Sequence, residues 1–312
     1  MRKVDQKFDL QYLYQVIQKN GFKEIISIEL IKNDYFSLLY LINDEFMIEF
    51  SKTPSVSTDF KTMVGLYRYY SKSVKVPRVL IYDQSKKIVP FVYAIFRKPP
   101  GVSLCSIWNG LDNETRTMVL HQTFAEIKKI NQHSPSFLNK PNYIYNYSKR
   151  KSSIHKLTSR CLKSNLSHGT KTKIKNYVRE YLPLLREETL VPTYGLFKFD
   201  YVFIDHKTVT GLTGFNNLII TSNDYLLESL FRMASDFLQA PFSRCYADPK
   251  AKLGFDRLLE IVEDELPEIF QYRDFEKRLG LYLLERSMKH YLKSNNHGSI
   301  RQEIEDILEI FG

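Results

Sequence analysis

Residues 191–215 read VPTYGLFKFDYVFIDHKTVTGLTGF, and this order of residues predicts a short loop followed by a β-hairpin. The pair Tyr194-Gly195 favours a tight turn at the start, and the residues over 201–205 and 209–215 favour two strands. The polar pair His206-Lys207 favours the turn between them. Few side chains of the loop have acid, base or metal-binding chemistry. The stretch therefore has the outline of an active-site loop without the residues expected on one.

The chain before this hairpin predicts a small sheet with helices. Strand-like segments cover residues 24–31, 35–42, 45–51, 76–83 and 88–97, and helical spacing of apolar residues covers residues 8–19 and 58–70. The turn pairs Asn33-Asp34 and Asn43-Asp44 separate the first three strand-like segments. Short polar turns between strands join antiparallel neighbours, so the sequence predicts an antiparallel meander here.

The remaining segments predict mainly helices. Apolar residues three and four apart, with an acidic first turn, predict a helix over residues 112–132. The same spacing predicts a helix over residues 171–188, bent near Pro183, and a mainly helical chain from Asp224 onward.

Length and element order together predict the fold class. A chain of 312 residues with 43% hydrophobic residues can bury a substantial core. Strands followed by helices, interrupted by one hairpin, favour an α+β protein of two lobes. We expect a small antiparallel-sheet N-lobe over residues 1–97, with one helix before the sheet and one within it. A large helical C-lobe is expected over residues 98–312.

The termini and the reactive residues give weaker indications. The N-terminal residues are charged and amphipathic, and no stretch has the roughly 18–20 apolar residues that a membrane span requires. We therefore predict a cytoplasmic protein without integral membrane association. Cys105, Cys161 and Cys245 are far apart and odd in number, which favours reduced thiols over a disulfide framework. The histidine spacing does not predict a zinc site.

One basic segment, residues 127–179, supplies the positive excess of a chain whose net charge is +10. It holds thirteen lysine and arginine residues and no aspartate or glutamate. Its apolar residues predict helix only in separate pieces, and the clearest of these pieces begins at residue 171. Tyrosines lie among the cations. Such a surface suits an anionic partner, which can be a nucleic acid, an acidic protein or an anionic membrane surface. The alternative is a solvated face without a partner. The candidate partner-binding residues are Lys149, Arg150, Lys151, Lys171, Lys173 and Lys175.

A run of motifs precedes the hairpin. It reads VPRVLIYD from residue 76 and VPFVYAIFRKPPGVSL up to residue 104. With the hairpin stretch, it resembles the aminoglycoside phosphotransferase family, which has a protein-kinase-like fold. The residues that carry the first match are Pro77, Arg78, Val79, Pro100, Gly101, Ser103 and Leu104. The hairpin stretch stands where the family has H-G-D-x-H-x-x-N followed by I-D-F. The resemblance covers roughly residues 20–290 and implies the family's bilobal fold.

Phosphoryl transfer requires a cation on the nucleotide phosphates, oxygen ligands for Mg²⁺ and an aspartate that orients the attacking hydroxyl. The resemblance places Leu196 where the family has its catalytic aspartate, and Tyr201 where it has a metal-binding asparagine. It places Gly214 at the principal Mg²⁺ carboxylate. The phosphate-binding cation falls near Glu49, and its glutamate partner falls near Met63. The sequence therefore predicts a pseudokinase without cofactor, which acts as a scaffold or regulator of a protein partner.

Two alternatives remain at this point. A shifted register makes Asp200 and Asp205 a catalytic pair of an ATP- and Mg²⁺-dependent small-molecule phosphotransferase, with Asp224 or neighbouring asparagines as further ligands. Asp205 is otherwise a turn residue at the end of a strand. The second alternative is a nucleic-acid-associated protein that binds through the basic segment. The aromatic residues Phe197, Phe199 and Tyr201 either fill a former nucleotide site or pack beneath the hairpin.

Overall fold

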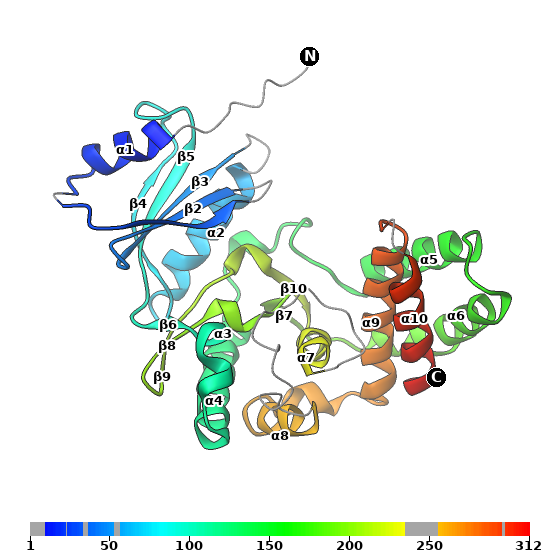
Figure 1. Cartoon of the computed structure of the whole chain (residues 1–312). Helices are drawn as coiled ribbons and strands as arrows, with labels where there is room; N and C mark the ends of the chain where they lie inside the picture. Colours follow the sequence, from blue (N-terminus) through cyan, green and yellow to red (C-terminus); the bar gives the residue numbers. More distant parts are fainter. Residues whose placement is uncertain (1–9, 23, 34–36, 53–56, 235–254, 295–296) are drawn as a thin grey trace, which may run out of the picture. The chain divides into compact units, whose positions relative to one another are not determined.

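The computed structural model describes residues 10–22, 24–33, 37–52, 57–234, 255–294 and 297–312. The chain divides into two compact units (Figure 1). Unit 1 comprises Met1–Val102 and Phe203–Asn216, and unit 2 comprises Ser103–Val202 and Asn217–Gly312. The predicted boundary after residue 97 lies a few residues before the first division. The hairpin strands, which were expected in the helical C-lobe, belong mostly to unit 1.

Unit 1 is built on a five-stranded sheet in the order β1-β2-β3-β5-β4. Its strands are β1 (Ile28–Asn33), β2 (Ser37–Ile42), β3 (Phe46–Ser51), β4 (Arg78–Asp83) and β5 (Val92–Arg97). All neighbouring strands are antiparallel, which confirms the predicted meander. Asn43 and Asp44 both adopt positive φ in the three-residue connection between β2 and β3, where the Glu45 N–H donates to the Ile42 carbonyl at 3.0 Å and closes a tight turn. Part of the other turn pair, Asn33-Asp34, lies outside the described residues.

Two helices accompany this sheet, α1 (Leu10–Lys19) and α2 (Ser57–Tyr70). Ile48 and Phe50 of β3 are both fully buried, because side chains two residues apart on a strand share a face. They join one apolar cluster with Leu13 and Val16 of α1. The helix spacing of the sequence thus buries α1 against the sheet.

The predicted hairpin forms from β8 (Val202–Asp205) and β9 (Thr208–Leu212). The short strand β6 (Val102–Ser103) pairs with β8 along the edge opposite to β9. His206 takes a positive φ in the turn. Gly101 precedes β6 at φ +80°, and a Cβ added there would lie 1.9 Å from the carbonyl oxygen of Ile204. Residue 101 of the Pro100-Gly101 turn must therefore be glycine, because any side chain there would collide with the backbone of Ile204.

Unit 2 combines a two-stranded sheet with helices. The sheet pairs β7 (Leu190–Tyr194) with β10 (Leu218–Ser222) in antiparallel fashion. The helices are α3 (Leu104–Ile107), α4 (Asn113–Gln132), α5 (Tyr147–Leu162), α6 (His168–Tyr181), α7 (Leu226–Ala234), α8 (Phe255–Glu265), α9 (Phe275–Tyr291) and α10 (His297–Ile310). Asp112 caps α4 by accepting the Thr115 N–H, which explains the sharp start of the predicted helix.

The basic segment is more helical than its sequence pattern predicts. α5 is a continuous helix of 16 residues, capped by the Asn146 side chain, which accepts from the Lys149 N–H. Helices therefore cover the basic segment in separate pieces, as predicted, and α5 is one that the sequence pattern did not locate. α6 ends at Tyr181, and a 3-10 segment, Leu182–Arg186, continues the chain, so the helix changes its geometry next to Pro183 as predicted.

Three further expectations can be compared with the described residues. Among them, no helix combines the length and the apolar character needed to cross a bilayer. Cys161 is free and buried. Cys105 is disulfide-bonded, so the expectation of reduced thiols is wrong for that residue. Cys245 lies outside the described residues. Neither the helices nor the cysteines test the cytoplasmic location, which stays a prediction.

Candidate functional site

Unit 1 carries Glu49 where the resemblance predicts a phosphate-binding cation. Glu49 lies on β3 and is paired with Leu39 of β2 and Ala94 of β5. Its carboxylate accepts a hydrogen bond from the Ser37 hydroxyl at 2.7 Å and lies 3.9 Å from Lys32 Nζ, and only 12% of its side chain is exposed. The sheet therefore holds the Glu49 carboxylate between a hydroxyl and a lysine, and its correspondence to a phosphate-binding position stays a prediction.

The other two degenerate positions of unit 1, Met63 and Gly214, carry no charge. Met63 is a buried residue of α2. Gly214 has φ +78° and lies next to Phe215. The Phe215 ring stacks on Tyr67 of α2, with centroids 4.8 Å apart and planes at 4°, and meets Tyr70 edge-on at 5.5 Å. The aromatic framework around this turn is thus well packed, while the residue that would ligate Mg²⁺ has no side chain.

In unit 2, Leu196 follows a firmly held glycine. The Gly195 N–H donates to the carbonyl of Asn217 at 2.8 Å, and the Gly195 carbonyl accepts from Arg286 Nη2 at 2.8 Å. The Leu196 side chain is half-buried and has no group that can accept a proton. The loop backbone is therefore positioned, but its side chain cannot act as a base.

Aromatic side chains fill the rest of this loop. Phe197 and Phe199 have no exposed surface, with ring centroids 6.3 Å apart. The Tyr201 hydroxyl accepts from Asn217 Nδ2 at 3.0 Å. Burial raises the pKa of Tyr201, and the neighbouring Asp200 carboxylate raises it further. Core packing by Phe197 and Phe199 is confirmed, whereas the filled nucleotide site stays a prediction.

The two aspartates of the shifted register belong to different units. Asp200 is exposed, and Asp205 ends β8 with 52% of its side chain exposed, 3.8 Å from His206. Asp224 is buried and accepts from Arg278 Nε at 2.6 Å. Throughout the described ranges, no three His, Cys, Asp or Glu side chains gather closely enough to hold a metal ion. These positions agree with Asp205 as a turn residue and Asp224 as half of a structural ion pair.

The candidate cluster of three cations on α5 divides between two sides of the helix. Arg150 is only 2% exposed, and it donates to the Glu285 carboxylate and to the Thr221 hydroxyl, each at 2.9 Å. The prediction that Arg150 meets a partner at the surface is therefore wrong, because its guanidinium is buried and paired. Lys149 and Lys151 are exposed. Lys149 Nζ donates to backbone carbonyls just before the helix.

The lysines of α6 also differ from one another. Lys171 is half-buried, whereas Lys173 and Lys175 are exposed. Lys175 and Lys151 line one pocket together, and the other four residues do not. Sequence reasoning missed five polar residues that share this pocket: Tyr147, His155, Thr158, Arg179 and Arg186. Their spacing of three and four residues along each helix is the signal that finds them.

Solved structures match the chain over nearly its whole length. The ADP-bound aminoglycoside phosphotransferase APH(2'')-Ib matches with a TM-score of 0.66 over 97% of this chain and 99% of its own, at 13% sequence identity. A GDP complex of a mutant aminoglycoside 2'-phosphotransferase-IIIa matches with a TM-score of 0.70 over 97% of both chains, at 14% identity. The chain has the fold of the aminoglycoside phosphotransferases. Its predicted bilobal, kinase-like α+β class is confirmed.

A third match extends the comparison to a ternary complex. The streptomycin–ATP complex of APH(2'')-IIa matches with a TM-score of 0.65 over 98% of this chain and 99% of its own, at 12% identity. No protein-family model matches the chain, and no curated protein matches its sequence. The likeness therefore concerns the fold, and the activity must be argued from the side chains.

Proposed function

We propose that this protein is a pseudokinase, a scaffold or regulatory protein with a phosphotransferase fold that binds a partner and transfers no phosphate. The observation that carries the proposal is the Glu49 carboxylate, held by Ser37 and Lys32 in the sheet of unit 1. ATP brings about four negative charges, and a nearby carboxylate repels them instead of neutralising them. A kinase places a cation, not a carboxylate, beside the phosphates of the nucleotide.

Unit 2 supports the same proposal independently. A leucine follows Gly195, in a loop whose backbone is held by Asn217 and Arg286. A hydrocarbon side chain can neither accept the proton of an attacking hydroxyl nor orient that hydroxyl by hydrogen bonding. The scaffold is thus retained where the reactive groups are replaced, which is the pattern expected if the fold serves binding.

A thermal-shift titration with ATP tests the proposal. A nucleotide at 100 times its Kd would stabilise the folded protein by about 2.7 kcal/mol, which is several degrees in Tm. We expect a rise of less than about 1 °C at millimolar ATP, whether or not Mg²⁺ is added. The matched variant Glu49→Lys places a cation at the same position of β3. A thermal shift with ATP in this variant alone would show that the missing cation limits nucleotide binding.

The alternative enzyme makes the opposite prediction. If Asp200 and Asp205 form a catalytic pair, Tm rises with Mg·ATP and the protein turns over ATP. Both signals are then lost in Asp200→Ala. An exposed aspartate contributes little to stability, so this variant is expected to fold normally. Mg²⁺-dependent ATP turnover that Asp200→Ala abolishes would replace the pseudokinase with a phosphotransferase.

A further inference from the structure

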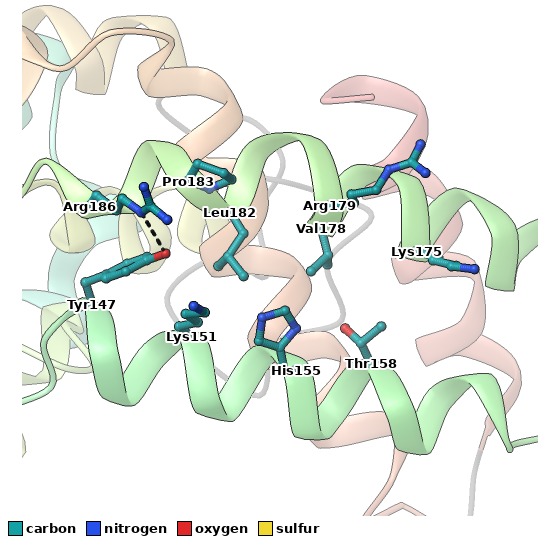
Figure 2. A pocket seen from close by; sticks show the side chains of 10 residues that line it. All are labelled: Tyr147, Lys151, His155, Thr158, Lys175, Val178, Arg179, Leu182, Pro183 and Arg186. Atoms are coloured by element: carbon teal, nitrogen blue, oxygen red, sulfur yellow. Dashed lines mark hydrogen bonds between the residues drawn. The ribbon is translucent and has the colours of Figure 1, made fainter.

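A pocket lies in unit 2 between α5 and the chain formed by α6 and the 3-10 segment after it (Figure 2). Its volume is about 370 Å³. The lining residues of α5 are Tyr147, Lys151, His155 and Thr158, and those across from them are Lys175, Val178, Arg179, Leu182, Pro183 and Arg186. Neither the degenerate loop before the hairpin nor the strands of either sheet contribute to it. The pocket is therefore separate from the positions expected for phosphoryl transfer.

The sequence creates this pocket through its helical spacing. The four residues of α5 recur at intervals of four, four and three, which places them on one face of the helix. The six residues opposite alternate between intervals of three and one, which also selects one face. In Figure 2, Val178 and Leu182 point toward the row on α5, whereas the Arg179 side chain extends away from α5 and Lys175 lies toward one end of the pocket. Each helix thus contributes cations to the lining of the pocket.

The pocket combines an apolar floor with cationic walls. Val178 and Leu182 are buried, and Pro183 and the ring of Tyr147 add apolar surface. Four side chains that carry positive charge at neutral pH surround this floor, and no carboxylate is among the lining residues. A ring or hydrocarbon body can lie on such a floor while an anionic group reaches the walls.

The cations of the walls are available. Within the part of the chain that the structure describes, the side chains of Lys151, Lys175 and Arg179 form no ion pair or hydrogen bond. Arg186 Nε donates to the Tyr147 hydroxyl at 3.3 Å, and its guanidinium lies 5.9 Å from the Tyr147 ring centroid. Like charges that share a pocket without counter-charges repel one another, and a bound anion relieves this repulsion. Contact with Arg186 also orients the tyrosine ring beside the pocket.

We propose that this pocket binds a small aromatic phosphate monoester. The ring lies on the apolar floor beside Tyr147, and the phosphate binds to cations of the pocket walls, which come from both helices. A phosphate monoester carries close to two negative charges at neutral pH and offers three acceptor oxygens, which suits several lysine and arginine donors at once. The inference goes beyond the proposed pseudokinase role, and it does not depend on the loss of catalysis.

The size of the pocket favours a small molecule over a polymer. Pockets for small ligands usually span several hundred Å³, and this one, at about 370 Å³, can enclose a ring with one phosphate. A nucleic acid would be bound by rows of cations on an open surface, including exposed residues such as Lys156 and Lys173 outside the pocket. The two cases therefore depend on different lysines.

Calorimetric titration of the full chain with phenyl phosphate tests the inference, without metal and at low salt. Inorganic phosphate serves as the anion without the ring, and benzyl alcohol serves as the ring without the anion. We expect phenyl phosphate to bind at least about tenfold more tightly than inorganic phosphate, because only the ester buries a ring. Benzyl alcohol is expected to give no measurable binding. Added salt is expected to weaken the binding of phenyl phosphate.

A pair of double variants locates the binding. Lys151→Ala with Arg179→Ala removes one pocket cation from each helix, and Lys156→Ala with Lys173→Ala removes one exposed cation from each helix outside the pocket. We expect the first pair to weaken phenyl phosphate binding at least about tenfold and the second pair to change it less than twofold. All four side chains are exposed, so both proteins are expected to fold, and their thermal unfolding checks this.

Each contrary result has a distinct meaning. Equal losses in the two double variants, or none in the first, would overturn the pocket, as would binding restricted to RNA or to an acidic peptide. If phenyl phosphate fails to bind while Mg·ATP also gives no thermal shift, the pocket is refuted and the loss of catalysis stands. If Mg·ATP is turned over while phenyl phosphate binding depends on the pocket cations, the pseudokinase is refuted and the pocket stands.

Discussion

The two faces of α5 carry neighbouring cations in opposite surroundings. On the buried face, Arg150 donates to Glu285 at 2.9 Å, and its guanidinium lies 4.3–4.6 Å from the ring centroids of Tyr145, Tyr225 and Tyr282. On the pocket face, Lys151 is exposed and lies among other cations. Position on the helix, and not charge, therefore separates a side chain that holds the fold from one that can bind a ligand.

The buried face belongs to a larger set of ion pairs around α9. Arg278 of α9 pairs with Asp224 at 2.6 Å, and Arg232 of α7 donates to Glu228 at 2.5 Å and to Glu303 at 2.8 Å. All of these groups are almost fully buried. Burial alone would lower the pKa of Arg150, but the Glu285 carboxylate and the surrounding tyrosines outweigh it and raise this pKa. The pairs are therefore buried structural elements of unit 2.

The largest expected effect is a loss of stability in Arg150→Met. Removing one partner of a buried ion pair leaves Glu285 charged and unpaired, which typically costs about 3–5 kcal/mol. The matched variant Lys151→Met on the next residue is expected to change the free energy of unfolding by no more than about 0.5 kcal/mol. Urea denaturation followed by circular dichroism measures both.

A double variant extends this test. Replacing Glu285 by leucine in the Arg150→Met protein removes the unpaired charge, so part of the lost stability is expected to return. Similar stability losses in Arg150→Met and Lys151→Met would contradict the division of α5 into a structural and a binding face.

The second expected effect concerns Cys161, which lies on the same buried face. Burial raises the pKa of its thiol from 9.0 to about 11, against a smaller lowering by Arg160. The thiolate is the species that reacts with iodoacetamide, so two pKa units lower the reactive fraction at pH 8 about a hundredfold. We expect native Cys161 to be alkylated at least about a hundredfold more slowly than in the urea-unfolded chain, as measured by mass spectrometry of its peptide.

The pH dependence sharpens this prediction. In the native protein, the rate is expected to rise about tenfold per pH unit up to about pH 10, whereas the rate of an ordinary thiol levels off above about pH 9. A native rate close to the unfolded one would show that this side of α5 opens readily, and the comparison between its two faces would lose its physical basis.

Much of the fold could be predicted because its signals are local. The turn pair Asn43-Asp44 tolerates positive φ, and the alternation around Ile48 and Phe50 selects one face of the sheet. Asp112 marks the start of a helix by capping it. The helix α5 was missed because its apolar residues are few, and the cation Arg150 occupies one of its buried positions. A buried charge is invisible to periodicity when its partner, Glu285, lies far away in the sequence.

The candidate site could be predicted only in part for the same reason. Alignment with a family motif predicts Leu196, Gly214 and Glu49 as degenerate positions from the order of residues alone, and that assignment stays a prediction. The assignment of Arg150 to a surface failed, since the basic segment gives no sign of where its partners lie. The pocket also requires two helices to face each other, and the distance between Lys151 and Arg179 along the chain conceals this.

The smallest expected effect arises at Glu188, which contacts the start of α5. Its two carboxylate oxygens accept the Tyr147 N–H at 2.8 and 2.9 Å. A carboxylate near a helix N-terminus is favourable, but here burial outweighs the Tyr147 hydrogen bond and the attraction of Arg150 and Arg278, and it raises the pKa of Glu188 above 4.5.

A raised carboxyl pKa stabilises the fold below the unfolded-state pKa, and that contribution disappears as pH rises through the folded-state pKa. We therefore expect wild type to lose a little stability relative to Glu188→Gln as pH increases from about 4 to neutrality, measured by urea denaturation of both proteins. The opposite slope would show that the helix terminus and its cations dominate, and that even the first turn of α5 is governed by charge instead of burial.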